Sequence, residues 1–237
     1  MIKQAKKIAI IIPAYNEEPV LAATIKDLQK YAARGKHNIE IIVIDDASSD
    51  ATAAVAVRAG ARVITHLINT GCGGATATGL HIAKEEGFDL AVTTDGDGQH
   101  SAKDVFSGIR RMQRSPVDLL IGNRLNSAEG MPKIKILGNR GLGIITRILF
   151  RVSVQDTQSG LRIFSKRAIN QLHWRTQRYG FCSEMLWRAR QQHLVVAEYP
   201  ISATYTEYSK AKGQNNWGVL QILQALLKRR VLDFFSE

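Results

Sequence analysis

The first half of the chain alternates short apolar runs with segments whose apolar residues recur every three or four positions. Ile8–Ile12 and Ile39–Ile44 are continuous runs rich in β-branched residues, whereas Leu21, Ile25 and Leu28 are spaced as on one face of a helix. Continuous runs predict strands buried on both faces, and helical spacing predicts helices packed against them. Further strands are expected at 62–67, 88–94 and 117–122. This alternation predicts an α/β fold with a mostly parallel central sheet and helices on both faces.

A capping box at Ser101 and Asp104 predicts a helix that begins there and runs to Gln113. The second half of the chain is less regular. Beyond the fifth strand, we expect helices at 134–151 and 181–192 and extended segments at 158–164 and 194–205. A helical pattern recurs over 217–235, beside the basic group Lys228-Arg229-Arg230.

Polar residues follow each of the five predicted strands, and in a parallel sheet these ends meet at the ligand-binding edge. After the fourth strand come Asp95 and Asp97, one residue apart, and then Gln99. Residues i and i+2 of an extended chain point to the same side, so both carboxylates can face one ion. Oxygen ligands with few protein donors suit Mg²⁺ or Mn²⁺ that also binds a diphosphate. A solvated acidic turn is the alternative.

Charge is distributed unevenly along the chain. Residues 1–120 hold 14 Lys and Arg against 14 Asp and Glu, whereas residues 121–237 hold 18 against 7, so the whole net charge of +11 lies in the second half. Such asymmetry favours a polyanionic partner such as nucleic acid, an anionic membrane or a phosphorylated substrate. The second half shows no obvious nucleic-acid-reading helix and no basic platform interleaved with aromatics, so nucleic acid is not expected. Cys72 and Cys182 have no metal-ligand spacing, which favours a reduced, cytoplasmic protein without structural zinc.

Several short motifs follow one another along the chain: Pro13-Ala14-Tyr15-Asn16-Glu17, Asp45-Asp46, Asn69-x-Gly71, Asp95-x-Asp97-Gly98-Gln99-His100, Gly122-Asn123-Arg124 and Asp156-x-x-Ser159-Gly160-x-Arg162-x-Phe164. In this order the chain resembles the family-2 glycosyltransferases with a GT-A fold, especially the polyprenyl-phosphate (dolichol-phosphate mannosyltransferase-like) branch. The resemblance covers about residues 8–215 and includes Phe181-x-x-Glu184. It implies an inverting, metal-dependent enzyme that moves a sugar from a UDP- or GDP-sugar to a polyprenyl phosphate.

The resemblance also implies a donor site. Asp46 would accept a hydrogen bond from the base. Lys210 and Lys212 would close over the diphosphate, and a solvated basic loop is the alternative for them. The base and ribose pocket would be lined by Pro13, Ala14, Tyr15 and Glu17. Mg²⁺ or Mn²⁺ would be held by Asp95, Asp97 and Gln99, with Asp95 alternatively touching the ribose. Structural alternatives are a strand-ending turn for Pro13 and Tyr15 and a helix-capping carboxylate for Asp46.

On the acceptor side, the resemblance implies that Arg124 and Arg140 bind the acceptor phosphate, because a guanidinium matches phosphate oxygens. Surface ion pairing is the alternative for both. Asp156 would act as a general base or orient the acceptor. An acceptor phosphate is already ionised, so a structural role for Asp156 is also open. Glu184 would support the site from behind or form a surface pair.

We expect a catalytic domain at 1–215, with a nucleotide-sugar-binding half at 1–122 and an acceptor-binding half at 123–215, and an amphipathic helical tail at 216–237. The basic second half and the tail predict peripheral attachment to the cytoplasmic membrane face, either to anionic lipid or to a membrane partner protein. The alternative is a tail packed on its own domain or on a second copy in a homo-oligomer. Two other functions stay open: transfer to a soluble or saccharide acceptor, and non-catalytic binding of nucleotide-sugars or polyanions.

Overall fold

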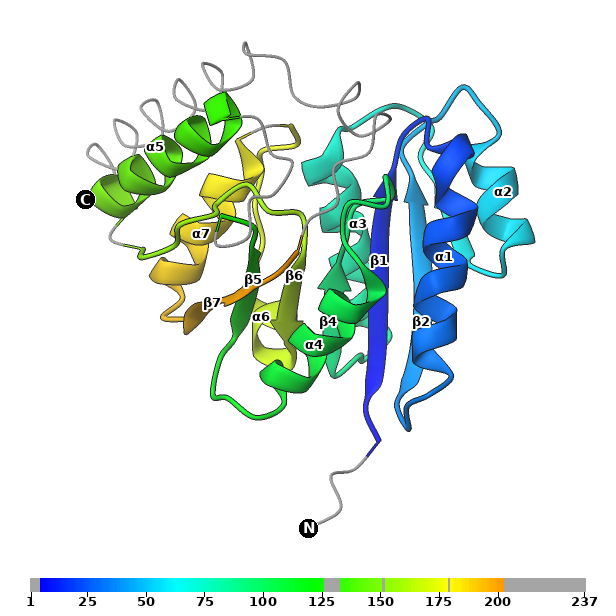
Figure 1. Ribbon diagram of the computed structural model, residues 1–237, viewed down its shortest axis with the longest axis horizontal. Helices are drawn as coiled ribbons and strands as arrows, with labels where there is room; N and C mark the ends of the chain where they lie inside the picture. The colour runs from blue at the N-terminus through cyan, green and yellow to red at the C-terminus, as the bar shows by residue number, and fades with distance from the viewer. Residues whose placement is uncertain (1–4, 126–132, 151, 179, 203–237) are drawn as a thin grey trace.

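The computed structural model describes residues 5–125, 133–150, 152–178 and 180–202 (Figure 1). Its strands are β1 (Lys7–Ala14), β2 (Asn38–Asp45), β3 (Arg62–Thr65), β4 (Leu90–Thr93), β5 (Leu119–Asn123), β6 (Arg162–Ser165) and β7 (Val196–Pro200). Its helices are α1 (Glu18–Ala32), α2 (Thr52–Arg58), α3 (Cys72–Glu85), α4 (Ala102–Met112), α5 (Lys133–Phe150), α6 (Lys166–Gln171) and α7 (Phe181–Gln191).

The strands form one sheet in the order β3-β2-β1-β4-β6-β5-β7. All neighbours pair in parallel except β6, which runs antiparallel to both β4 and β5. The predicted mostly parallel sheet is therefore confirmed. The strand expected at 158–164 begins only at Arg162, because the preceding residues form a loop that turns around the buried Asp156. The short helix α6, which follows β6 directly, was not predicted.

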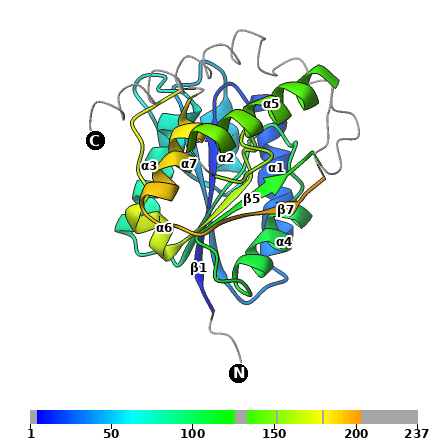
Figure 2. The ribbon, with the colours of Figure 1, turned by 90° about the vertical axis from the view of Figure 1, so that its left-hand side faces the viewer.

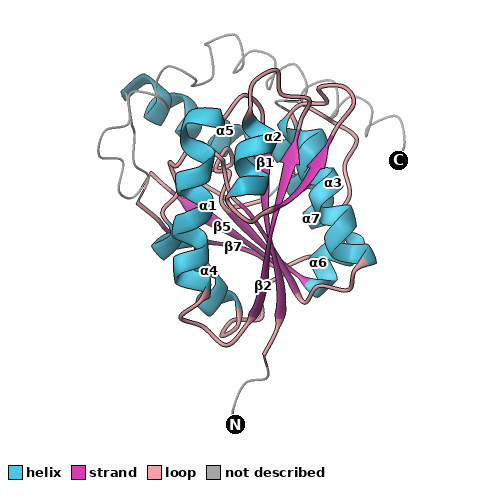
Figure 3. Cartoon of the chain, turned by 90° about the vertical axis from the view of Figure 1, so that its right-hand side faces the viewer, coloured by secondary structure: helices cyan, strands magenta, loops and turns pink. Residues whose placement is uncertain are grey.

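Helices cover both faces of the sheet, as predicted (Figures 2 and 3). On β1, Ile8, Ile10 and Ile12 pack with residues of α1, α2 and α4, whereas Ala9 and Ile11 pack with residues of α3, α6 and α7. All five side chains are fully buried. Successive residues of a strand point to opposite faces, so a continuous apolar run can be buried on both. Two cores thus fix the strands that carry the site.

Helix α4 begins as the capping box predicted. The hydroxyl of Ser101 accepts a hydrogen bond from the backbone nitrogen of Asp104 at 3.1 Å.

No helix within the described residues is both long enough and apolar enough to cross a membrane. The predicted tail at 216–237, together with Lys210 and Lys212, lies outside the described residues, and the predicted domain boundaries stay a prediction.

We expect Gly79→Ala to destabilise the protein. A Cβ at Gly79 of α3 would lie 2.3 Å from Cγ2 of Ile11, and overpacking costs about 1–3 kcal/mol, against about 1 kcal/mol gained from the helix propensity of alanine. Gly138→Ala is the matched control, because an added Cβ in that part of α5 meets nothing within 4 Å and should stabilise the helix. Urea denaturation measures both; equal gains in stability would contradict the close packing of α3 on β1.

Candidate active site

A cavity of about 280 Å³ opens at the carboxyl edge of the sheet, where β1, β2 and β4 end. It is lined by Pro13, Ala14, Tyr15, Glu17, Asp46, Cys72, Ala75, Asp95, Gly96, Asp97 and Gln99. Every donor-site residue predicted within 1–122 therefore lies around one space. Cys72 and Ala75 of α3 were not predicted as site residues, although they follow the polar end of the third strand and the strand-end argument could have found them.

Asp46 is a buried carboxylate at the end of β2. Its Oδ1 atom accepts hydrogen bonds from the backbone nitrogen of Thr70 at 2.9 Å and from Nδ1 of His66 at 2.8 Å. Its Oδ2 atom accepts one from the backbone nitrogen of Gly71 at 2.6 Å. Burial alone would raise the pKa of Asp46, but the hydrogen bonds from Thr70, His66 and Gly71 together hold it below its usual value. Asp46 thus fixes the turn before α3; its predicted contact with a nucleotide base stays a prediction.

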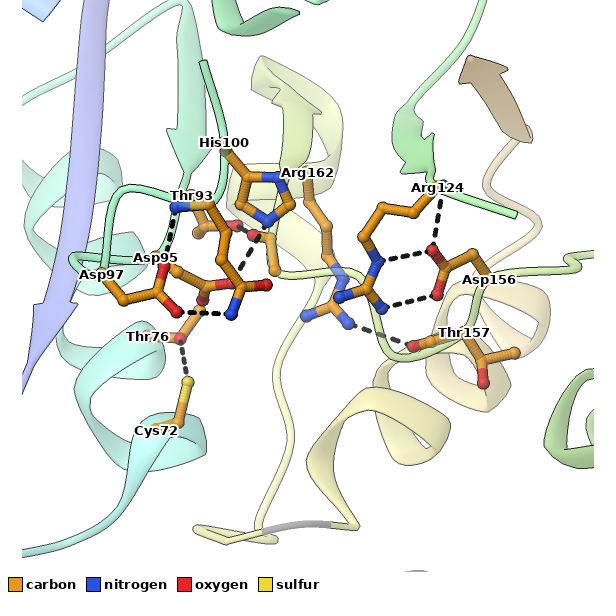
Figure 4. A network of polar contacts seen from close by, with 12 residues as sticks. Cys72, Thr76, Thr93, Asp95, Asp97, His100, Arg124, Asp156, Thr157 and Arg162 are labelled. Atoms are coloured by element: carbon orange, nitrogen blue, oxygen red, sulfur yellow. Dashed lines mark hydrogen bonds and ion pairs between the residues drawn. The ribbon is translucent and has the colours of Figure 1, made fainter. Parts of the chain in front are cut away.

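Asp95 follows β4, and its carboxylate packs against Gly160 in the loop before β6 (Figure 4). A Cβ on Gly160 would lie 2.3 Å from either carboxylate oxygen of Asp95, so only glycine permits this approach. His100 donates from Nε2 to Oδ2 of Asp95 at 3.1 Å. Burial would raise the pKa of Asp95, but the hydrogen bond from His100 and the charges of Arg124 and Arg162 hold it below its usual value. Asp95 is therefore ionised at neutral pH.

Asp97 differs from Asp95 in that its pKa is raised rather than lowered. Burial, followed by repulsion from Asp95, raises the pKa of Asp97 to about 6. The backbone nitrogen of Gln99 donates to Oδ1 of Asp97 at 3.0 Å, and its side-chain nitrogen Nε2 donates to Oδ2 at 2.7 Å. The amide nitrogen of Gln99, rather than its oxygen, thus faces Asp97. Gln99 orients that carboxylate, and its own contact with a cation stays a prediction.

The residues of this edge fit a divalent cation shared with a ligand. Asp95 and Asp97 are hard oxygen donors, and their mutual repulsion would be relieved by a cation near both. Within the described parts of the chain, no group of three or more His, Cys, Asp or Glu side chains forms a metal site. Asp95 and Asp97 would not fill the coordination shell of such an ion by themselves, which suits an ion that takes its remaining ligands from a diphosphate and water.

A buried ion pair lies on the other side of the site (Figure 4). The guanidinium of Arg124, just beyond β5, donates from Nε to Oδ2 of Asp156 at 2.7 Å and from Nη2 to Oδ1 at 2.8 Å. The backbone nitrogen of Arg124 donates to the same carboxylate at 3.0 Å. Because Asp156 is fully buried and both its oxygens accept hydrogen bonds from Arg124, the two residues behave as one structural unit.

Comparison with known proteins identifies the family. The model of glycosyl transferase family 2 matches residues 9–173. The chain belongs to this family. Among its relatives, the UDP-N-acetylglucosamine–dolichyl-phosphate N-acetylglucosaminyltransferase of Methanococcus voltae is 39% identical and aligns over 96% of this chain and 99% of its own. The human dolichyl-phosphate β-glucosyltransferase is 28% identical over 94% of this chain and 74% of its own.

A solved structure supports the fold. The glucosyl-3-phosphoglycerate synthase of Mycobacterium tuberculosis, in complex with Mn²⁺, UDP-glucose and phosphoglyceric acid, matches with a TM-score of 0.71 at 19% identity. The match covers 95% of this chain and 80% of that one. The predicted family and GT-A fold are thus confirmed. As a family-2 glycosyltransferase, the protein is an enzyme that transfers sugars.

The sequence predicted no role for Arg162, whose buried guanidinium lies close enough to Asp95 to lower the pKa of that carboxylate. Arg162, the first residue of β6, is 1% exposed, and its Nη2 atom donates to the carbonyl of Thr157 at 3.2 Å. Its Nε atom has no hydrogen-bond partner among the described residues. The guanidinium carbon lies 5.2 Å from the centre of the Phe181 ring. Arg162 therefore adds positive charge behind Asp95.

The remaining predicted acceptor-site residue is Arg140, which lies on α5 with an exposed side chain. It is not among the described residues that line the cavity. Arg124 is buried and bonded to Asp156, so the structure does not present the two arginines as one exposed pair. Their roles in phosphate binding stay predictions.

Asp46→Asn is expected to lower the free energy of unfolding at pH 7 by about 1.5–3 kcal/mol, because hydrogen bonds to a charged acceptor are lost. The pKa of Asp46 is lowered on folding, so its contribution is present above the unfolded value of 3.8 and is lost as the pH falls through the folded value. The difference between wild type and variant should therefore shrink below about pH 4. Urea denaturation between pH 7 and pH 3 measures it; a constant difference would contradict this account.

Proposed function

We propose that this glycosyltransferase moves a sugar from a UDP- or GDP-sugar to a polyprenyl phosphate at a membrane surface. One observation carries the donor side: the polar ends of three parallel strands surround a single cavity that contains the Asp95 and Asp97 carboxylates. The acceptor class is supported by the names of the relatives from Methanococcus voltae and human, which both act on dolichyl phosphate. In this proposal, residues 1–122 bind mainly the donor and residues 123–215 the acceptor.

On the donor side, Asp95 and Asp97 would hold Mg²⁺ or Mn²⁺, and Gln99 would orient Asp97. When bound, the cation would neutralise charge on the departing nucleoside diphosphate. Pro13, Tyr15 and Asp46 would contact the base and ribose from the strand ends. Glu17 and Ala14 line the same space. Lys210 and Lys212, which lie outside the described residues, would close over the diphosphate.

On the acceptor side, the nucleophile is a phosphate oxygen, which is ionised near neutral pH and needs no general base. It attacks the anomeric carbon opposite the nucleoside diphosphate, the new carbon–oxygen bond forms, and the electron pair of the broken bond leaves with the diphosphate. The burial of Asp156 and its bonds to Arg124 favour an orienting role for Asp156 over proton transfer. Arg124 and Arg140 would attract the acceptor phosphate. Catalysis is then mainly positioning and electrostatic stabilisation.

We expect Asp97→Ala to lower sugar transfer by at least 100-fold, because several kcal/mol of leaving-group stabilisation are lost and each 1.36 kcal/mol is tenfold. Transfer of labelled sugar from UDP- and GDP-sugars to a polyprenyl phosphate in detergent measures it. Asp89→Asn is the control, because Asp89 lies at the opposite end of β4, where its carboxylate accepts a hydrogen bond from the backbone nitrogen of Lys7 at 2.9 Å.

Parental transfer by a folded Asp97→Ala variant would overturn the proposed function. A parallel assay with 3-phosphoglycerate as acceptor separates the acceptor classes. Transfer to that soluble phosphate, with none to the lipid, would favour the soluble-acceptor alternative.

An apolar stripe on α5 supports action at a membrane surface. Leu137, Ile144 and Ile148 are 73%, 60% and 71% exposed, and their spacing of seven and four places them on one face of the helix. Arg140 and Arg147 are exposed on the same helix. Exposed aliphatic side chains flanked by basic residues are typical of helices that lie in a lipid interface.

Replacing Ile144 and Ile148 together by serine is expected to weaken binding to vesicles with anionic lipid by at least tenfold, since burying each side chain contributes about 1.5–3 kcal/mol. Vesicle flotation at low and high salt measures binding. Val57→Ser is the control, because Val57 on α2 is 60% exposed but lies outside the stripe. A chain lacking 217–237 tests the tail in the same assay. Unchanged recovery of the Ile144/Ile148 variant would rule out α5 as the contact.

A further inference from the structure

A short segment between α6 and α7 lies across the beginning of α3. We call residues 174–178 the strap. Nε1 of Trp174 donates to the carbonyl of Gly73 at 3.0 Å, and the backbone nitrogen of Gly74 donates to the carbonyl of Gln177 at 3.1 Å. A Cβ on Gly73 would lie 2.6 Å from the Gln177 carbonyl oxygen and 2.7 Å from that of Thr176. The contact therefore requires glycine at the start of α3.

Glu184, in the first turn of α7, holds the strap from the other side. Glu184 is 2% exposed, and its carboxylate accepts hydrogen bonds from the backbone nitrogens of Arg175 at 3.0 Å and Thr176 at 2.8 Å. The hydroxyl of Thr176 donates to the same carboxylate, and Nε of Arg188 lies 3.7 Å from it. Glu184 is thus a buried anion rather than half of a surface pair. Two backbone N–H groups of the strap are among the donors that compensate its charge.

The strap connects this anion to the wall of the donor cavity. Helices α3 and α7 lie on the same face of the sheet (Figure 3). Cys72 and Ala75 of the first turn of α3 line the cavity, and Gly71 donates its backbone N–H to Asp46 on the other wall. A Cβ on Gly71 would also lie 3.0 Å from the Gln177 carbonyl oxygen. The start of α3 is therefore held between Asp46 and the strap.

We propose that Glu184 is a positioning residue for donor recognition: through the strap it fixes the α3 wall of the cavity. The inference rests on the proposed function only in taking a nucleoside diphosphate as the ligand. It makes Glu184, a residue of the second half that does not line the cavity, a determinant of donor affinity.

Glu184→Gln is expected to weaken binding of UDP or GDP, in the presence of Mn²⁺, by about tenfold. The variant keeps the size of the side chain, but its amide nitrogen cannot accept a hydrogen bond from the strap. Isothermal titration measures affinity. In steady-state assays the KM for the sugar donor should rise while kcat and the KM for the acceptor change less than threefold. Without any ligand, hydrogen exchange should become faster in the strap and in the first turn of α3.

Asp118→Asn is the matched control. Asp118 precedes β5 at the opposite end of the sheet, and its carboxylate also accepts from a backbone nitrogen, that of Val195 at 3.0 Å, and from a hydroxyl, that of Ser165 at 3.0 Å. Its loss should lower the melting temperature without changing nucleotide affinity. Equal weakening of nucleotide binding by Asp118→Asn and Glu184→Gln would overturn the inference, since both effects would then reflect lost stability.

A second variant changes the contact between α3 and the strap on the α3 side. Gly73→Ala should push the strap away and weaken nucleotide binding, and its combination with Glu184→Gln should weaken binding by less than the product of the two single effects, because both act on one contact. Should Glu184→Gln fail to fold, Thr176→Val can replace it in the same experiments, because this variant removes only the hydroxyl contact with Glu184. Its nucleotide affinity should then fall by less than tenfold.

The outcomes separate the two proposals. Wild-type affinity and exchange in a folded Glu184→Gln protein would overturn the positioning role while leaving the proposed function intact. A wild-type protein that binds neither UDP nor GDP would overturn the proposed function. The exchange measurement without ligand would then decide, by itself, whether Glu184 holds the start of α3.

Discussion

The carboxylate of Asp156 is fully buried, and the cost of removing a charge from water must be offset locally. Arg124 supplies three hydrogen bonds, and the two joined residues tie the end of β5 to the loop before β6. The backbone of that loop is held in turn by Glu198, which accepts from the backbone nitrogen of Asp156 at 2.9 Å. The same loop brings Gly160 beneath Asp95. The hydroxyl of Thr93 donates a hydrogen bond to the carbonyl of Gly160 at 2.9 Å. The position of Asp95 therefore depends on an ion pair on the far side of the site.

The electrostatics of the donor edge follow from this arrangement. Asp95 has two arginines and a histidine behind it, so it keeps its charge although it is partly buried. Burial and then repulsion from Asp95 raise the pKa of Asp97, and the hydrogen bond from the Gln99 backbone and the charge of His100 offset this only in part. Two carboxylates in one concave site, pushed apart in pKa, are typical of functional rather than structural groups. A divalent cation held by Asp95 and Asp97 would relieve the repulsion between the two carboxylates.

The sequence predicted the first half well because its strands are continuous apolar runs and each is followed by polar residues at the same sheet edge. All the donor-site residues predicted within 1–122 therefore meet in one cavity. The pattern carried less information in the second half. β6 has four residues, two of them polar, so neither its start nor its antiparallel direction could be deduced from periodicity. Partners 32 residues apart, such as Arg124 and Asp156, leave no local trace in the sequence. An arginine considered by itself is equally consistent with a phosphate ligand and with a member of an ion pair, so the role of Arg124 could not be predicted.

The cavity is in contact with the second half of the chain, and the predicted division into a donor half and an acceptor half stays a prediction. Among the described residues, those that line the cavity all lie at or before Gln99. Its α3 wall, however, is in contact with the strap, which belongs to the second half and carries the glycine-dependent contact at Gly73. Arg162 likewise reaches the environment of Asp95 from β6. A displacement of the strap would therefore reach the α3 wall of the cavity through packed backbone. The cavity at the edge of the sheet is therefore shaped by residues from both halves of the chain.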